Sequence, residues 1–88
     1  MSEIKNKIHE LKCWLIYFPP VVCGDKKFEC RLNDRDYKVG DFLLLKEWDP
    51  ETKEYTGRVQ EVIVDYILRD FVGLQPGYVL MSISKIDF

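Results

Sequence analysis

Short apolar runs separated by turn residues recur along the whole chain and leave little room for long helices. Alternating or β-branched residues typical of strands occupy residues 8–13, 27–33, 41–48, 59–68 and 78–86. Residues 49–57 predict a hairpin tip, and Gly-Leu-Gln-Pro-Gly at 73–77 breaks the chain. We therefore expect a mainly β (α+β) fold with one or two short helices. About five strands predict a small closed or half-closed β-barrel, because closure removes sheet edges.

The alternation also predicts which side chains share a face. In residues 27–33, Phe28, Cys30 and Leu32 face one way, and Lys27, Glu29, Arg31 and Asn33 face the other. In residues 59–68, one face carries Val62, Val64, Tyr66 and Leu68. Residues 41–48 are rich in Leu and Phe, which predicts a strand covered on both faces.

One short helix is expected at residues 17–23. Pro19 and Pro20 fit only in its first turn, where their missing N–H groups are not needed, and Gly24 follows as the C-terminal cap. The same prolines interrupt the longest apolar run, residues 13–24, so no segment resembles a membrane span. The N-terminus has no apolar signal segment, which favours a cytoplasmic protein without a membrane partner.

Length and charge limit the function classes. The 88 residues predict a single domain over residues 1–88, with a flexible N-terminus at residues 1–7. Thirteen basic and fifteen acidic residues give a net charge of −2, which excludes a strongly basic nucleic-acid coat protein. Any nucleic-acid binding must therefore rest on a local site.

The three cysteines do not form a recognisable framework. The chain has an odd number of cysteines, Cys13, Cys23 and Cys30, and no C-x-x-C pair. His9 is its only histidine. We expect small buried thiols in a reduced compartment, with no metal and no cofactor. His9 is expected to be a surface or hydrogen-bonded strand residue.

Residues 24–31 carry the most specific pattern, G-x-K-x-x-E-x-R, where the helix ends and a strand begins. Lys26 sits at the turn. Glu29 and Arg31 are two apart on one strand, so their Cα atoms lie about 6.6–6.8 Å apart on the same face. A carboxylate, a guanidinium and an ammonium together can hold a nucleobase edge or a phosphate. The same trio can instead be a structural salt bridge that closes the barrel, and this alternative stays open.

In this context the pattern resembles the ASCH family of the PUA-like superfamily, in its bacterial and phage subgroup of unknown function. The resemblance runs from about residue 9 to residue 86. Further matching residues are His-Glu-Leu-Lys at 9–12, Tyr-Phe at 17–18, Asn-Asp-Arg-Asp at 33–36, Val-Gly-Asp at 39–41, Glu-Tyr-Thr-Gly-Arg at 54–58 and Gly-Leu-Gln-Pro-Gly-Tyr-Val at 73–79. It makes Gly24, Gly40 and Asp41 structural positions. Relatives carry helix-forming residues where Pro19 and Pro20 stand, which predicts a shorter or later helix here.

The resemblance implies a cleft beside the motif strand that binds RNA or modified nucleosides. Some ASCH-like members are amidohydrolases that remove an acyl group from acetylcytidine. By position, Lys26 corresponds to their catalytic Lys and Glu61 is a candidate for their later Glu. Their catalytic Thr position is Glu29 here, and a carboxylate cannot replace a hydroxyl nucleophile directly. This departure favours a binding protein over an enzyme.

The loop after the motif supplies further candidates for RNA contact: Asn33, Arg35, Tyr37 and Lys38. Tyr37 is the aromatic residue that we expect to stack on a base. The alternative for Arg35 and Lys38 is a solvated loop, and for Asn33 a turn. Most other aromatic residues, including Trp14 and Tyr17, are expected in the core, and the acidic segment 47–54 is expected to be solvated.

Three functions follow as hypotheses. The first is RNA or nucleotide binding in a cleft lined by Lys26, Glu29 and Arg31, with a shallow salt dependence. The second is a small amidohydrolase acting on a modified nucleoside. The third is a protein-interaction module that uses an exposed aromatic patch around Trp48 and Tyr55.

Overall fold

The computed structural model describes residues 6–86, and its sheet contains five strands. The elements in chain order are β1 (Ile8–Trp14), α1 (Phe18–Cys23), β2 (Phe28–Leu32), β3 (Phe42–Asp49), β4 (Glu54–Arg69) and β5 (Tyr78–Lys85). The expected mainly β class with one short helix is confirmed. A flexible N-terminus was expected at residues 1–7. Residues 1–5 of this range lie outside the part of the chain that the structure describes. Lys7 is held at both its N–H and its carbonyl, by Asp41 Oδ1 and by the N–H of Phe42.

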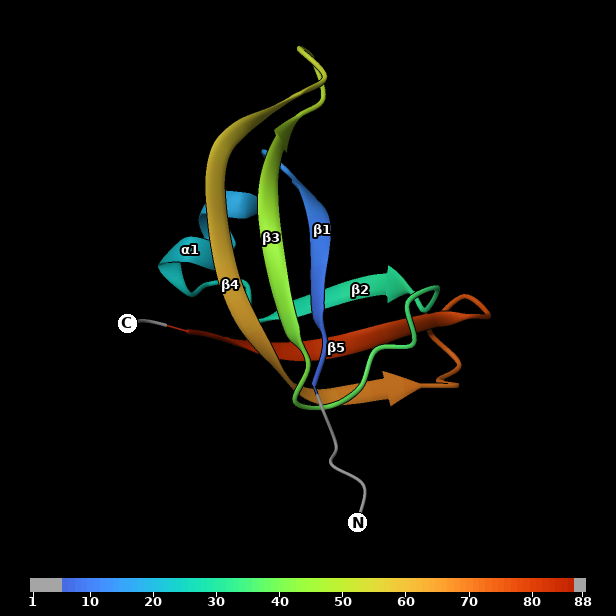
Figure 1. The fold of residues 1–88 in the computed structure, drawn as a ribbon. Coiled ribbons are helices and arrows are strands. Elements are labelled where there is room, and N and C mark those ends of the chain that lie inside the picture. The colour runs from blue at the N-terminus through green and yellow to red at the C-terminus, as the bar shows by residue number, and fades with distance from the viewer. Residues whose placement is uncertain (1–5, 87–88) are drawn as a thin grey trace.

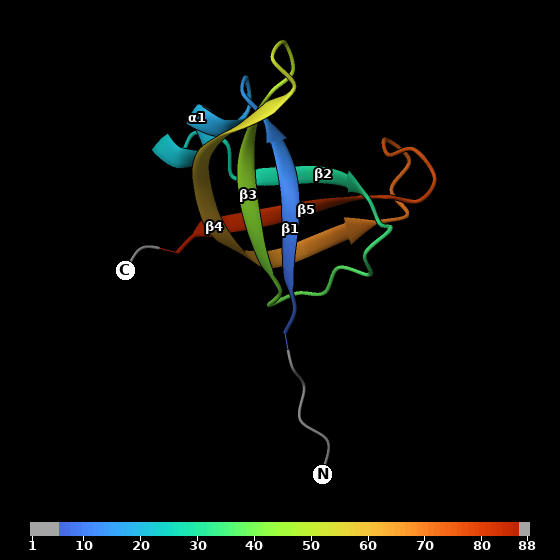
Figure 2. The same cartoon turned by 45° about the horizontal axis from the view of Figure 1, so that its top comes forward.

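The strands form one curled sheet in the order β1-β3-β4-β5-β2. β1 pairs in parallel with β3, and the other pairs are antiparallel, including the predicted hairpin of β3 and β4. β4 is long enough to belong to two layers. Its first part lies beside β3, and its second part turns to run with β5 behind them (Figures 1 and 2). The two edge strands, β1 and β2, therefore approach each other across the open seam of a half-barrel.

α1 begins and ends as its sequence requires. Its two prolines occupy the first turn, and Gly24 follows in the left-handed conformation with φ of 89°. The N–H of Gly24 donates to the carbonyl of Val21, which closes the last turn. Phe18 and Val21 are the buried residues of the helix, so α1 covers one part of the half-barrel interior.

A bulge changes the face pattern of β4. Val62 and Val64 are buried as predicted, but the register with β5 shifts between Val64 and Tyr66. After the shift Ile67 is buried and Tyr66 is exposed, so the predicted face of four alternating residues is wrong. One extra residue in one strand reverses the faces beyond it and bends the strand, which lets β4 pass between the layers.

β3 is covered on one face rather than on both. Leu43 and Leu45 are fully buried, whereas the alternate residues of the strand are partly exposed. Glu47 continues the buried face. The expectation of a solvated acidic segment at 47–54 is therefore wrong for Glu47. Its carboxylate accepts two hydrogen bonds from Arg58 and one from the hydroxyl of Thr56, which lower the Glu47 pKa against the effect of burial.

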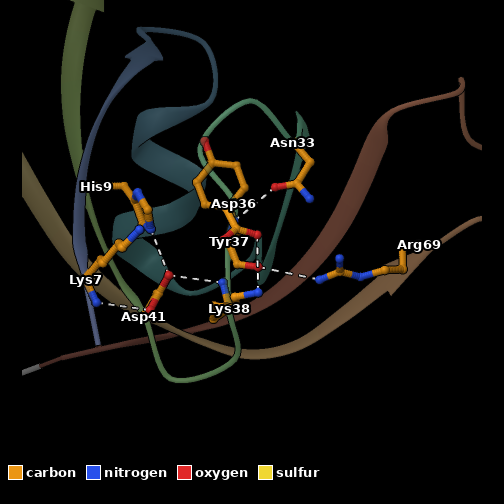
Figure 3. A network of polar contacts seen from close by, with 8 residues as sticks. All are labelled: Lys7, His9, Asn33, Asp36, Tyr37, Lys38, Asp41 and Arg69. Atoms are coloured by element: carbon orange, nitrogen blue, oxygen red, sulfur yellow. Dashed lines mark hydrogen bonds and ion pairs between the residues drawn. The ribbon is translucent and has the colours of Figure 1, made fainter. Parts of the chain in front are cut away.

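The connection 33–41 packs against the start of β1 through a buried polar network (Figure 3). His9 Nε2 lies 2.8 Å from Asp41 Oδ2, and the N–H groups of Lys7 and Lys38 also donate to this carboxylate. Tyr37 packs its ring edge-on against His9, with 4.8 Å between the ring centroids. Asp41 therefore ties the loop to the start of β1 before β3 begins.

No helix in the described part of the chain is long and apolar enough to span a membrane.

Candidate functional site

A cleft of about 610 Å³ lies at the seam between the edge strands β1 and β2. Its lining combines cations, aromatic rings and a buried carboxylate: Lys12, Cys13, Trp14, Tyr17, Lys26, Phe28, Glu29, Cys30 and Arg31. The volume lies within the ordinary range of small-molecule sites. The cleft exists because β1 and β2 are the two strands that the sheet leaves without a second partner.

β2 turns its charged face toward this cleft. Glu29 is only 4% exposed, whereas Phe28 and Leu32 are about half-exposed. The alternation was predicted correctly, but the polar face is the inward one. Burial of this carboxylate is possible because two cations compensate its charge.

Glu29 is held between those two cations. Lys26 Nζ lies 2.8 Å from Glu29 Oε1, and Arg31 Nε lies 2.9 Å from Glu29 Oε2. Both carboxylate oxygens are thus engaged. The structural ion pair that the sequence left as an alternative is present.

Arg31 also joins the two edge strands. Its Nη2 donates to the carbonyl of Lys12 on β1 at 2.7 Å. Arg35 makes a second bridge of the same kind, from Nη1 to the carbonyl of Glu10 at 3.0 Å. These two arginines satisfy carbonyls of an edge strand that has no neighbouring strand on that side.

Aromatic rings surround the Lys26 ammonium. Nζ lies 4.8 Å from the centroid of the Phe28 ring and 5.6 Å from that of Tyr17, and it donates to the carbonyl of Phe28. These contacts leave part of the donor capacity of both Lys26 and Arg31 free.

Three cations and one carboxylate line the cleft, so its formal charge is +3 − 1 = +2, on a chain whose net charge is −2.

Comparison with known proteins adds a family. Residues 8–83 match the family described as "Domain of unknown function (DUF3850)". The chain belongs to this family. It is also similar to "Uncharacterized 12.9 kDa protein in GpA 3'region" of Escherichia phage P2, with 46% identity over 55 residues, which covers 62% of this chain and 49% of the relative. The chain thus spans about half the length of that relative.

These matches agree with the expected family of unknown function with phage members. The finer resemblance of this DUF3850 chain to ASCH proteins stays a prediction.

The structure brings together the three motif residues but not the other predicted contacts. Tyr37 is 1% exposed, so the expectation that it stacks on a base does not fit its position. Asn33 accepts a hydrogen bond from the N–H of Tyr37 and acts as a turn residue. Lys38 pairs with Asp36 on the exposed side of the loop, 3.2 Å from it.

Glu61 does not line the cleft of the DUF3850 chain. It lies on β4 opposite Leu44 and next to the buried Val62, so its side chain is on the outer face of the sheet, two strands away from β1, whereas Glu29 is buried on the inner side. Among the described residues, no group of three or more His, Cys, Asp or Glu side chains is placed to hold a metal ion. The expected absence of metal and cofactor stays a prediction.

Sequence reasoning missed the aromatic lining. Trp14 and Tyr17 were expected in the core, yet both are about half-exposed at the cleft. The signal was available for Trp14, because the alternation of residues 8–13 extends to it and places it on the exposed face with Lys12. No comparable signal marked Tyr17, which precedes the helix in an irregular turn.

The thiols give a direct check on this geometry. Cys23 and Cys30 are exposed, contrary to expectation, and only Cys13 is buried. Burial, and next the nearby Glu29 charge, raise the pKa of Cys13 to about 11. We expect Cys23 and Cys30 to react with iodoacetamide near pH 8 while Cys13 stays unmodified until the chain is unfolded, because the thiolate is the reactive form. Mass spectrometry of labelled peptides measures this, and rapid labelling of Cys13 in the native protein would contradict the described burial.

Proposed function

We propose that this DUF3850 chain binds RNA or a nucleotide in the cleft between β1 and β2. The observation that carries the proposal is the combination of half-exposed aromatic rings with cations around one cleft. Aromatic rings stack on nucleobases, and Lys and Arg contact phosphate oxygens. The resemblance of residues 24–31 to the ASCH motif supports the same proposal.

Each part of the cleft has a distinct role in this proposal. The base stacks among Trp14, Tyr17 and Phe28, while the free donors of Lys26 and Arg31 contact phosphate or base acceptors. Glu29 orients both cations and neutralises part of their charge, since both of its oxygens are already engaged. The small number of free cations predicts a shallow dependence of affinity on salt.

Binding without hydrolysis suits these residues better than amidohydrolase chemistry. The position that would require a hydroxyl nucleophile is Glu29, which is locked between two cations. Glu61, the candidate later carboxylate, does not line the cleft. Incubation with acetylcytidine is therefore expected to release no cytidine.

The proposal is tested with Lys26→Met, which removes the ammonium and keeps an apolar stem. We expect the affinity for ribonucleoside 5′-monophosphates to fall by about 10- to 100-fold, since a charge-assisted hydrogen bond is worth roughly 1.5–3 kcal/mol. Quenching of tryptophan fluorescence by the nucleotide measures the affinity, because Trp14 lines the cleft.

Lys27→Met is the matched control, because Lys27 is exposed and does not line this cleft. Equal affinity for the two variants would contradict the assignment of the cleft. Unfolding curves for both variants show whether a loss of binding reflects a loss of fold.

A further inference from the structure

The outer face of β1, β3 and the first part of β4 carries a row of aromatic side chains. Trp14 lies opposite Trp48 in the parallel pair, and Trp48 lies opposite Tyr55 in the antiparallel pair. Residues opposite each other in neighbouring strands point to the same face. The ring centroids of Trp14 and Trp48 are 5.9 Å apart. The row thus crosses three strands that lie side by side in Figure 1.

Two lysines are interleaved with these rings. Lys12 Nζ lies 3.9 Å from the centroid of the Trp48 ring, and Lys46 Nζ lies 4.8 Å from that of Tyr55. Lys12 and Lys46 are themselves opposite each other in the sheet. We call Trp14, Trp48, Tyr55, Lys12 and Lys46 together the aromatic row.

The aromatic row is continuous with the cleft. Lys12 and Trp14 belong to both, because they lie on β1, the edge strand that forms one wall of the cleft. A ligand that leaves the cleft over the edge of β1 therefore meets Trp14 first and then Trp48.

Acidic side chains lie on both sides of the aromatic row. Glu10 and Glu61 flank Leu44 in the neighbouring cross-strand row, and Glu10 Oε1 lies 3.4 Å from Lys46 Nζ. Beyond Tyr55, Asp49 and Glu54 form the last pair of β3 and β4 before the hairpin tip. Since these carboxylates repel phosphate, a polyanion is confined to the row itself.

We propose that the aromatic row is a stacking platform for a single strand of RNA that continues from the cleft. This inference rests on the proposed function and specifies its ligand as an oligonucleotide rather than a free nucleoside. Bases stack on the rings, and the two lysines move from the ring faces to the phosphates. That exchange is favourable because base stacking on an aromatic ring is stronger than an exposed cation–π contact.

Charge distinguishes this proposal from docking of a protein on the same aromatic residues. Lysine is depleted in protein–protein interfaces, whereas here an ammonium lies over two of the three rings. Alternation of rings and cations is the arrangement that single-stranded nucleic-acid sites use. The protein-interaction alternative becomes an outcome of the test.

The test compares uridine 5′-monophosphate with a fluorescein-labelled oligouridylate of about eight nucleotides. Trp48→Leu and Tyr55→Leu remove rings that belong to the aromatic row but do not line the cleft. We expect each to weaken oligouridylate binding by about tenfold and to leave the monophosphate affinity within about twofold. Tyr66→Leu is the matched control, because this exposed tyrosine of β4 lies outside the row, and it should change neither affinity.

The outcomes separate the two proposals. If the monophosphate binds but the oligouridylate binds no more tightly and neither row variant affects it, the platform is wrong and the cleft proposal stands. If neither ligand binds the native protein, both proposals are wrong. Loss of a protein partner on Trp48→Leu together with unchanged oligouridylate affinity would assign the row to protein interaction and overturn the platform.

Discussion

Replacing Asp41 with alanine is expected to lower the free energy of unfolding by about 3–5 kcal/mol. The carboxylate is buried and accepts hydrogen bonds from His9 and from the N–H groups of Lys7 and Lys38. An orphaned buried donor costs roughly 1–3 kcal/mol; the His9 contact is buried and the two N–H contacts are part-buried. A loss of this size is a large part of the typical 5–15 kcal/mol of a native domain, and urea unfolding at neutral pH measures it.

The same carboxylate predicts an acid sensitivity. Burial alone would raise the pKa of Asp41, but the hydrogen bonds from His9, Lys7 and Lys38 outweigh burial and lower it. Since the folded pKa lies below the unfolded one, the stabilisation is complete above about pH 4 and is lost as the pH falls through the folded pKa.

The control for Asp41→Ala is Asp36→Asn, which removes the charge of an exposed ion pair in the same loop. It is expected to change the free energy of unfolding by no more than about 1 kcal/mol. Asn tolerates the positive φ of 52° at this position. Equal stability of the Asp41 and Asp36 variants would contradict the anchoring role of Asp41.

Glu29→Ala is the second substitution with a large expected effect. It leaves Lys26 and Arg31 facing each other in a half-buried seam without their shared counter-charge. Removing one partner of a fully buried ion pair costs about 3–5 kcal/mol. Both cations here keep some exposure to solvent, so we expect a smaller loss of stability, roughly 2–3 kcal/mol.

Glu10→Ala provides the comparison for Glu29→Ala, because Glu10 is an exposed glutamate on β1 whose only ion pair in the described part of the chain is 3.4 Å long. Its removal is expected to cost less than about 1 kcal/mol. If chemical denaturation gave Glu29→Ala the same stability as Glu10→Ala, the pairing of Glu29 with Lys26 and Arg31 would not hold the seam.

Much of the fold is predictable from local pattern. Alternation, apolar density and β-branched residues located all five strands, and the two prolines with Gly24 located the helix within one residue. The expected hairpin tip at 49–57 was too long, because β4 already begins at Glu54. The parallel pairing of β1 with β3 is not predictable in this way, because it depends on how distant segments meet. The bulge at Asp65 is also invisible in the sequence, since one unpaired residue leaves no mark in the alternation but reverses the faces after it.

The candidate site is predictable only in its centre. The spacing of Glu29 and Arg31 places them on one face, and the structure confirms that they and Lys26 meet. That face can point inward only because cationic side chains compensate the charge of Glu29. The alternation of a strand does not show whether such compensation is present in the fold. Tyr37 shows the converse: a residue in a polar loop is buried because the loop folds back onto His9.

The central claim is that the cleft between β1 and β2 is a nucleotide site, and an amide-shift NMR titration tests it most directly. The ¹⁵N-labelled protein is titrated with uridine 5′-monophosphate and then with oligouridylate. The account predicts shifts concentrated at residues 12–17 and 26–31 with the monophosphate, which spread to Trp48 and Tyr55 with the oligonucleotide. A spectrum that does not move with either ligand at millimolar concentration would contradict it and leave Lys26, Glu29 and Arg31 as a structural ion pair.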